Sequence, residues 1–279
     1  MIPAAFDYEV AESAEHAVEL LGRYGDEAKL LAGGQSLISF MKLRFARPSV
    51  LVDVGRLAEL AYVREDGGAI AIGALTRYAY AHRDELLRRE CPLLADAAGQ
   101  VGDPQVRHMG TIGGGAAHGD PAGDVPTALV ALGAELVARG PGGERRIAAP
   151  EFFRSPFETA LGPQEVLTEI RVPRLGGAGW AYLKFHPRAQ DWAIIGVAVV
   201  VGRNGSGPSI VLTNMGPTPV RAAAVESALR AGEDPAVASQ AAAEGTEPVS
   251  DAFASAEYRR ALAPVVVRRA IAEALARSH

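Results

Sequence analysis

The chain has 279 residues, a net charge of −5 at pH 7 and a pI of about 5.7, and 48% of its residues are hydrophobic. This length allows a large core, which we expect to be divided between two lobes. The acidic balance argues against binding to nucleic acid or to an anionic membrane surface. No apolar run approaches the ~20 residues of a membrane helix, and the N-terminus lacks a signal-peptide pattern, so we expect a soluble, cytoplasmic protein.

The single cysteine, Cys91, excludes an intrachain disulfide. It also excludes an iron–sulfur cluster held by this chain alone, because such a cluster needs several thiolates. We expect Cys91 to be buried. The six histidines are dispersed, and none forms a metal-binding pair. No acid–base or nucleophilic dyad is evident, so neither a metal site nor a set of catalytic residues is predicted.

The first ~55 residues predict a small α/β unit. Ser13 is a suitable N-cap for an amphipathic helix that runs to Tyr24, and Gly25 is expected to end it. The further elements expected in this unit are a short strand, a helix and a buried strand, at residues 29–32, 37–45 and 50–54.

The middle section begins near Arg56. We expect Thr76 to cap a helix, Pro92 to interrupt the helical stretch 84–98, and Asp124 to cap the helix that follows it. The strands expected here lie at residues 69–73, 135–138, 144–147 and 165–172, the second and third forming a hairpin.

The glycine-rich segment Leu175–Gly179 is the best candidate for a domain boundary. Three strands are expected beyond it, at residues 180–185, 193–201 and 209–214, the last two joined through Asn204–Gly207. Alanine-rich helices with apolar residues three and four positions apart are expected at residues 221–231, 235–243 and 257–276.

Two glycine-rich segments carry the strongest functional signal, AGGQS at residues 32–36 and TIGGG at residues 111–115. Glycine lets backbone N–H groups approach a ligand closely, and ordered N–H groups with Ser or Thr hydroxyls stabilise anions. Neither segment contains the lysine of a phosphate loop or the glycine spacing of a Rossmann turn. As a pair, they favour a ligand with two phosphates over ordinary tight turns.

Three stretches carry a resemblance to a known family: LAGGQSLISFMKLRFARPSVLVD at 31–53, DPQVRHMGTIGGGAAHGDPAGDVPTALVAL at 103–132, and the region from Lys184 to Trp192. They resemble the flavin-binding subunit of molybdenum hydroxylases, which is the medium subunit of aerobic carbon monoxide dehydrogenase and the flavin domain of xanthine dehydrogenases. The resemblance covers nearly the whole chain, from Phe6 onward.

This resemblance implies an α+β architecture with a vanillyl-alcohol-oxidase-type FAD-binding fold. The FAD-binding domain is expected at residues 1–175, as two α/β subdomains at about 1–55 and 56–175. A C-terminal domain of the carbon monoxide dehydrogenase flavoprotein type, a three-stranded antiparallel sheet with helices, is expected at residues 176–279.

The resemblance also assigns roles in binding FAD. The pyrophosphate is expected to contact the hydroxyls of Ser36 and Thr111. It is also expected to contact the backbones of five residues, Gly33, Gly34, Gln35, Gly113 and Gly114. Ala32 and Ile112 are expected to make main-chain or packing contacts. Asp124 is expected to accept from sugar or ribityl hydroxyls, and Lys184 to place a cation near the pyrophosphate or the reduced flavin. The main chain of Leu167 and the side chain of Trp192 are expected to face the flavin ring. A structural role remains an alternative for each of these residues. Asp124 could cap a helix and Leu167 could belong to the core of a strand. Lys184 could face solvent, and Trp192 could lie at the edge of a sheet.

Two residues depart from the family pattern. Gly115 stands where the motif usually carries Asn, and His118 where Asn is common. A side-chain amide makes one or two hydrogen bonds worth ~0.5–1.5 kcal/mol each, so its loss is expected to weaken FAD binding about tenfold. The substitution Gly115→Asn is expected to raise the affinity for FAD. His118 either donates to a phosphate, tunes the flavin or is structural.

By resemblance, the function is that of an FAD-binding electron-transfer subunit. It would pass electrons from two [2Fe–2S] clusters on an iron–sulfur subunit to a quinone, NAD⁺ or O₂. A molybdopterin-binding subunit would oxidise the substrate, in a heterotrimer or a dimer of heterotrimers. The alternatives are a stand-alone FAD-dependent oxidoreductase that acts directly on a small molecule, and a nucleotide-binding or scaffold protein without redox activity.

Overall fold

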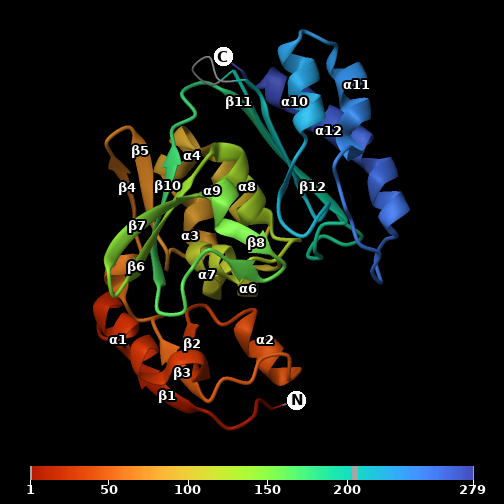
Figure 1. Ribbon diagram of the computed structural model, residues 1–279. Helices are drawn as coiled ribbons and strands as arrows, with labels where there is room; N and C mark the ends of the chain where they lie inside the picture. The colour runs from red at the N-terminus through yellow and green to blue at the C-terminus, as the bar shows by residue number, and fades with distance from the viewer. Residues whose placement is uncertain (1, 203–206, 279) are drawn as a thin grey trace.

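The computed structural model describes residues 2–202 and 207–278 (Figure 1). Three bodies follow one another along the chain, coloured red to orange, orange to green, and cyan to blue in Figure 1. The first body has a parallel sheet of strand order β1-β3-β2. Its elements are β1 (Asp7–Val10), α1 (Ala14–Tyr24), the 3-10 turn Gly25–Glu27, β2 (Ala28–Leu31), α2 (Leu37–Lys42) and β3 (Val50–Asp53).

Helix α1 begins and ends as predicted. The Ser13 hydroxyl accepts a hydrogen bond from the His16 N–H at 3.0 Å, and Gly25 ends the helix with φ 55°. Helix α2 is shorter than predicted, because Leu43 is its C-cap and Arg44 turns into the left-handed region with φ 67°. Strand β1 was not predicted, since its sequence DYEV is polar and half-exposed and pairs only with a distant strand.

The second body is a five-stranded sheet of order β4-β5-β10-β6-β7, covered by short helices. Its strands are β4 (Val63–Asp66), β5 (Ala69–Gly73), β6 (Glu135–Gly140), β7 (Gly143–Ala148) and β10 (Val166–Pro173), with β8 (Phe153–Ser155) and β9 (Glu158–Thr159) as a separate pair. Its helices are the 3-10 turn Ala58–Leu60, α3 (Tyr78–Arg83), α4 (Glu85–Glu90), α5 (Pro92–Gly99), α6 (Pro104–Met109), α7 (Ile112–His118), α8 (Asp124–Leu132) and α9 (Ala149–Phe152). Cys91, between α4 and α5, is fully buried as expected.

Two predicted helix caps are wrong. Arg77, not Thr76, is the residue before α3, and the Thr76 hydroxyl donates instead to the Tyr62 carbonyl at 2.9 Å. Gly123 occupies the cap position of α8, and Asp124 is its first helical residue. The Asp124 side chain is used in contacts with the third body, described below, and is therefore not folded back onto its own helix.

The third body has an antiparallel sheet of order β11-β12-β13-β14, so the predicted three strands gain a fourth of two residues. This short strand was missed because a segment of two residues is too short to show an alternation of polar and apolar residues. The elements are β11 (Gly179–Phe185), β12 (Ile195–Val201), β13 (Ser209–Thr213), β14 (Val220–Arg221), α10 (Ala223–Arg230), α11 (Pro235–Ala238), the 3-10 turn Ser239–Ala243 and α12 (Ala256–Ala276). In the predicted connection Asn204–Gly207, residues 204–206 lie outside the described residues.

Alternation along β12 explains how the third body is attached. Val197 and Val199 pack with Val267 and Ile271 of α12, on the side of the sheet where Figure 1 shows the blue helices. The intervening residues, Ala198 and Val200, belong instead to the core of the second body. The C-terminal sheet is therefore sandwiched between its own helices and the second body. No helix within the described residues is long and apolar enough to cross a membrane.

Candidate functional site

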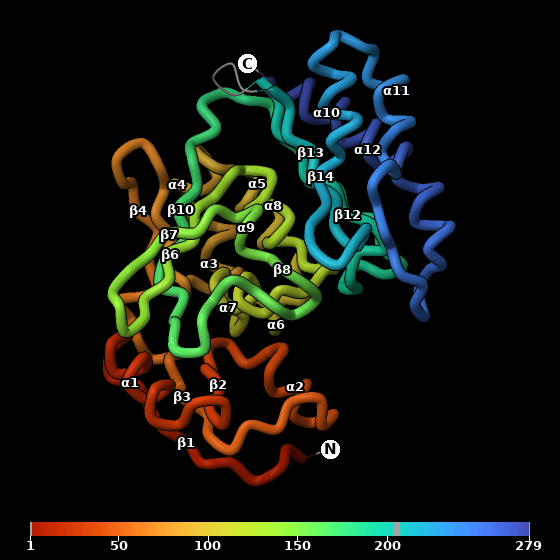
Figure 2. The backbone as a smooth tube through the Cα atoms, in the orientation of Figure 1, coloured from red at the N-terminus to blue at the C-terminus, as the bar shows by residue number. Residues whose placement is uncertain are grey.

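A cavity of about 820 Å³ lies where the three bodies meet. Figure 2 shows the loop after β2 facing the helices α6 and α7 across this boundary. All candidate residues line the cavity except Ile112, whose side chain is fully buried in the core. The volume is within the range of cofactor and ligand sites, which runs to roughly 1,000 Å³. The sequence motifs thus converge on one site.

The first glycine turn offers free hydrogen-bond donors. Within the described residues, the backbone N–H groups of residues 33–36 donate no hydrogen bond, and the Ser36 hydroxyl caps no N–H group. Gly34 lies in the left-handed region with φ 72°, which lets the chain turn from β2 into α2. Backbone N–H groups are seldom left unpaired, so this row of donors at the cavity wall is suited to an anion.

The second glycine turn is built differently. Thr111 caps α7, its hydroxyl accepting from the Gly114 N–H at 3.0 Å. The Ile112 and Gly113 N–H groups donate to the carbonyls of Thr76 and Ala74, each at 2.9 Å, and the Gly115 N–H donates to the Thr111 carbonyl. Contrary to expectation, the N–H groups of Gly113 and Gly114 are therefore already used within the protein. This turn gives the cavity a wall without side chains rather than a set of donors.

The glycines of both turns are needed for close backbone packing. A Cβ on Gly33 would lie 2.8 Å from the Cα of Gly110, and one on Gly113 would lie 2.7 Å from the carbonyl oxygen of Ala74. Real Cβ atoms stay beyond about 3.0 Å. The first turn is thus packed directly against the segment that leads into the second turn.

A buried ion pair also borders the cavity. The Asp124 carboxylate accepts from Lys184 Nζ at 2.9 Å and from the Tyr182 hydroxyl at 2.7 Å, and Lys184 also donates to the Gln100 carbonyl at 3.0 Å. The side chains of Lys184 and Asp124 are 3% and 7% exposed. Burial raises the pKa of Asp124 above its ordinary value, and the Lys184 ammonium opposes that shift.

These contacts decide between the alternatives for both residues. Lys184 is not solvent-facing; it places a buried cation at the cavity wall. Asp124 primarily holds this cation, although a carboxylate has further lone pairs with which it can accept from a ligand hydroxyl. Sequence reasoning missed Tyr182 and Gln100. For Tyr182 a signal was available, because residues 182 and 184 share one face of β11.

The remaining candidates surround the cavity in three different ways. Leu167 is buried, beside an irregularity in the pairing of β10 with β6 between Leu167 and Glu169. Trp192 lines the cavity and is 63% exposed. His118 packs between the rings of Phe40 and Phe157, whose centroids lie 5.2 Å and 5.0 Å away. Burial in this cluster lowers the pKa of His118, which favours a neutral, structural imidazole.

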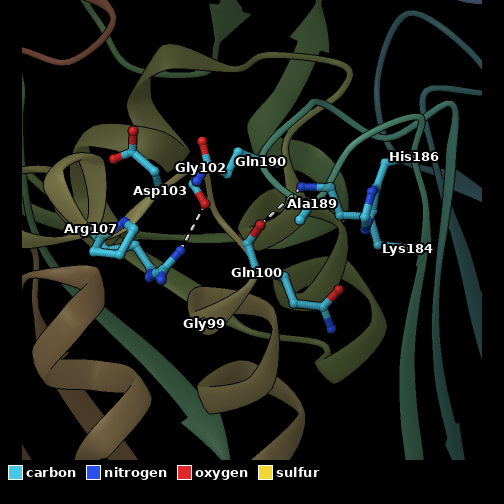
Figure 3. Close-up of a pocket in the computed structure, with 10 residues that line it drawn as sticks. Gly99, Gln100, Gly102, Asp103, Arg107, Lys184, His186, Ala189 and Gln190 are labelled. Atoms are coloured by element: carbon cyan, nitrogen blue, oxygen red, sulfur yellow. Dashed lines mark hydrogen bonds between the residues drawn. The ribbon is translucent and has the colours of Figure 1, made fainter.

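A second cavity of about 300 Å³ adjoins the first near Lys184 (Figure 3). The two cavities share Gly102, Asp103, Lys184 and Gln190. Arg107 donates to the Val101 and Gly102 carbonyls at 3.0 Å and 2.7 Å, so its charge is tied to the loop before α6. His186 also lines this cavity, and its Nδ1 is buried with no hydrogen-bond partner in the described part of the chain.

No group of three or more His, Cys, Asp or Glu side chains suited to a metal ion is found in residues 2–202 and 207–278. The large cavity is lined instead by amide donors that have no partner within the described residues, by a buried cation and by a wall of glycines. This combination fits an elongated, diphosphate-containing dinucleotide.

Comparisons with known proteins agree with this geometry. The family model for the FAD binding domain in molybdopterin dehydrogenase matches residues 4–175, and the model for the CO dehydrogenase flavoprotein C-terminal domain matches residues 180–274. The chain is 43% identical to the carbon monoxide dehydrogenase medium chain of Hydrogenophaga pseudoflava, over 99% of both chains. It is 40% identical to the 6-hydroxypseudooxynicotine dehydrogenase complex subunit alpha of Paenarthrobacter nicotinovorans, over 100% of this chain and 97% of that one.

Solved structures give the same result. A carbon monoxide dehydrogenase from Hydrogenophaga pseudoflava matches with a TM-score of 0.96 and 44% identity, over 100% of both chains. Quinoline 2-oxidoreductase from Pseudomonas putida 86 matches with a TM-score of 0.91 and 27% identity, over 98% of both chains. The resemblance and the α+β fold inferred from sequence are confirmed. The chain therefore belongs to the family of FAD-binding medium subunits of molybdenum hydroxylases such as carbon monoxide dehydrogenase, and it is a flavoprotein oxidoreductase subunit whose cofactor is FAD.

Proposed function

We propose that this chain relays electrons within a larger complex. Its FAD would receive them from [2Fe–2S] clusters on an iron–sulfur subunit and deliver them to an external acceptor, while a molybdopterin-binding subunit oxidises the substrate. Relatives that are medium chains of carbon monoxide dehydrogenases support this assignment. The single cysteine is consistent with it, because this chain alone cannot hold an iron–sulfur cluster and the clusters of such a relay would lie on another subunit.

The arrangement proposed for FAD places its pyrophosphate at the first glycine turn. The observation that carries this placement is the row of N–H groups at residues 33–36, which have no partner in the described part of the chain, beside the Ser36 hydroxyl, which caps no N–H group there. The flavin ring would then lie toward Leu167, Lys184 and Trp192, which line the same cavity. We further propose a division into an FAD-binding domain at residues 1–175 and a C-terminal domain at residues 176–279, so that the ring lies between them.

FAD supplies the redox chemistry, and the residues of this chain bind and orient it. Lys184 would hold a positive charge near the ring, and Asp124 and the Gln100 carbonyl fix the position of that charge. Because Lys184 and Asp124 satisfy each other, and His118 is enclosed by aromatic rings, these groups are poorly placed to exchange protons with a substrate. This favours electron relay over direct substrate oxidation.

One observation favours the alternative, a stand-alone FAD-dependent oxidoreductase. The second cavity in Figure 3 adjoins Lys184, has space for a small molecule and is lined by His186, whose Nδ1 has no partner among the described residues. A substrate bound there would be close to the proposed ring position and to a group able to exchange a proton.

Anaerobic reduction of the flavin separates the two functions. The full chain, purified with FAD, should be bleached by dithionite but not by purines, aldehydes or carbon monoxide. After addition of iron–sulfur and molybdopterin-binding chains encoded with it, the substrate of the complex should bleach the flavin. A mixture that lacks the iron–sulfur chain is the control and should stay yellow. Rapid bleaching of the isolated chain by one small organic substrate would overturn the relay assignment, and a matching loss on His186→Phe would identify the second cavity as the substrate site.

A further inference from the structure

Tyr78 occupies the space that a side chain at position 115 would need. A Cβ built on Gly115 would lie far inside 3.0 Å of the Tyr78 hydroxyl and 3.2 Å from Cζ of its ring. A Cβ on Gly110 would lie 2.8 Å from Cε2 of the same ring. The Tyr78 N–H also donates to the Gly110 carbonyl at 3.0 Å. The tyrosine is therefore held in a slot between two glycines, at the first residue of α3.

The hydroxyl at the end of this slot borders the large cavity. Tyr78 is only 7% exposed, it lines the cavity, and within the described residues its hydroxyl makes no hydrogen bond. The hydroxyl oxygen is not among the fully buried unpartnered atoms of the described residues, so it is open to the cavity. A tyrosine hydroxyl in a largely buried side chain usually finds a partner. Burial raises the pKa of Tyr78 well above its ordinary value, and the charges of Asp124 and Asp120 raise it further. The hydroxyl is therefore a protonated donor at the cavity, and no acceptor for it lies among the residues that the structure describes.

We propose that Tyr78 is an FAD-binding residue, whose hydroxyl donates a hydrogen bond to an oxygen atom of the bound cofactor. Gly115 is required because it leaves room for this hydroxyl. The inference rests on the proposed function, since it takes FAD as the occupant of the large cavity.

The proposal changes the interpretation of Gly115. From the sequence alone, Gly115 lacks the side-chain amide that Asn supplies in the family motif, and Gly115→Asn is expected to strengthen FAD binding. In the structure the tyrosine hydroxyl fills the corner that this side chain would enter. A polar group is therefore still present beside Gly115: it is the Tyr78 hydroxyl of α3 in place of a side-chain amide on α7. Gly115→Asn should lower FAD affinity, because its Cβ and the hydroxyl exclude each other.

A double-mutant cycle on the full chain tests the pair. The Kd for FAD is measured for the unmodified chain, Tyr78→Phe, Gly115→Ala and the double variant, or for the complexes isolated with each. Loss of the hydroxyl in Tyr78→Phe should weaken binding about tenfold, as expected for one hydrogen bond at the upper end of its usual range. Gly115→Ala should weaken it at least as much in the natural background.

In the Tyr78→Phe background, Gly115→Ala should change the Kd less than about threefold, because the nearest remaining ring atom lies 3.2 Å from the new methyl group and a small shift relieves the contact. Tyr80→Phe is the matched control. Tyr80 lies on the same helix and is 56% exposed, so this variant should bind FAD normally.

The melting temperature of the FAD-free chain separates a ligand contact from a structural role. The proposal requires Tyr78→Phe to weaken FAD binding while leaving this temperature within about a degree of the natural value. Equal affinities of the unmodified chain and Tyr78→Phe would overturn it, as would a loss of affinity that only follows a lower melting temperature. An increase in affinity for Gly115→Asn would also overturn it. An unmodified chain that binds no FAD would instead overturn the proposed function.

Discussion

Replacing Gly33 with alanine puts a methyl group where the first glycine turn is packed against the segment before α7. The new Cβ would lie 2.8 Å from the Cα of Gly110 and nearer still to the carbonyl oxygen of Met109, whereas ordinary contacts begin at 3.4 Å. Relief of the Gly110 contact alone requires a backbone movement of ~0.6 Å, and the closer contact with the Met109 oxygen requires more; neither neighbour is a flexible side chain. Overpacking of this kind costs about 1–3 kcal/mol. We expect the melting temperature to fall by roughly 2–4 °C for each kcal/mol lost.

The same movement displaces the free N–H groups at residues 33–36, so FAD affinity should fall at least tenfold, to be measured by equilibrium dialysis with absorbance detection. Gly22→Ala is the matched control. Gly22 is inside α1, and its new Cβ would lie 3.7 Å from the side chain of Gln164, an ordinary contact. This control should gain up to about 1 kcal/mol of stability and keep its flavin. A Gly33→Ala chain with unchanged melting temperature and full flavin content would refute both the tight packing and the assigned phosphate site.

Three further predictions concern buried charged or titratable groups. Lys184→Met leaves Asp124 buried without its cation and should lower the free energy of unfolding, measured with denaturant, by about 3–5 kcal/mol. The double variant with Asp124→Asn should recover part of this loss. Unchanged stability of Lys184→Met would contradict the buried ion pair. His118 has a pKa below 6.5 in the folded chain, so its contribution to stability is present above pH 6.5 and is lost as pH falls through the folded pKa. His118→Phe should therefore flatten the decline in melting temperature between pH 7 and 5, and the exposed His108→Phe is measured alongside as the control. Arg259 is fully buried and donates to the Ile194 and Val249 carbonyls, so Arg259→Met should cost about 3 kcal/mol while FAD content, read from absorbance, stays unchanged.

Local patterns predicted most of the secondary structure. The strand at residues 69–73 and the helix that follows Ser13 match the structure, because alternation and capping are properties of neighbouring residues. Strands β1 and β14 were missed for the opposite reason. Each is four residues or fewer and is defined by a partner strand distant in sequence, so its own residues carry little signal.

The candidate site was located from its motifs, but the roles within it were not. Both glycine turns line the cavity, as a shared ligand requires. Which turn has free donors depends on what lies opposite each N–H group. The carbonyls of Ala74 and Thr76 reach the second turn from the loop after β5, and within residues 2–202 and 207–278 no comparable acceptor reaches the first. That difference is set by tertiary packing, so glycine spacing alone could not reveal it.

Asp124 and Lys184 show how burial constrains such assignments. Treated one at a time, the carboxylate was assigned to sugar hydroxyls and the lysine to the flavin or its phosphates. A lysine side chain only 3% exposed needs a counter-ion at this position, because burying an unpaired charge costs several kcal/mol. Predicting a buried cation at the cavity wall therefore required predicting its counter-ion, and Asp124 was the acidic candidate already assigned to the same site. It follows that a flavin at this end of the cavity would experience an oriented ion pair rather than an isolated positive charge. The field at the ring would then depend on the geometry that Tyr182 and Gln100 impose on that pair.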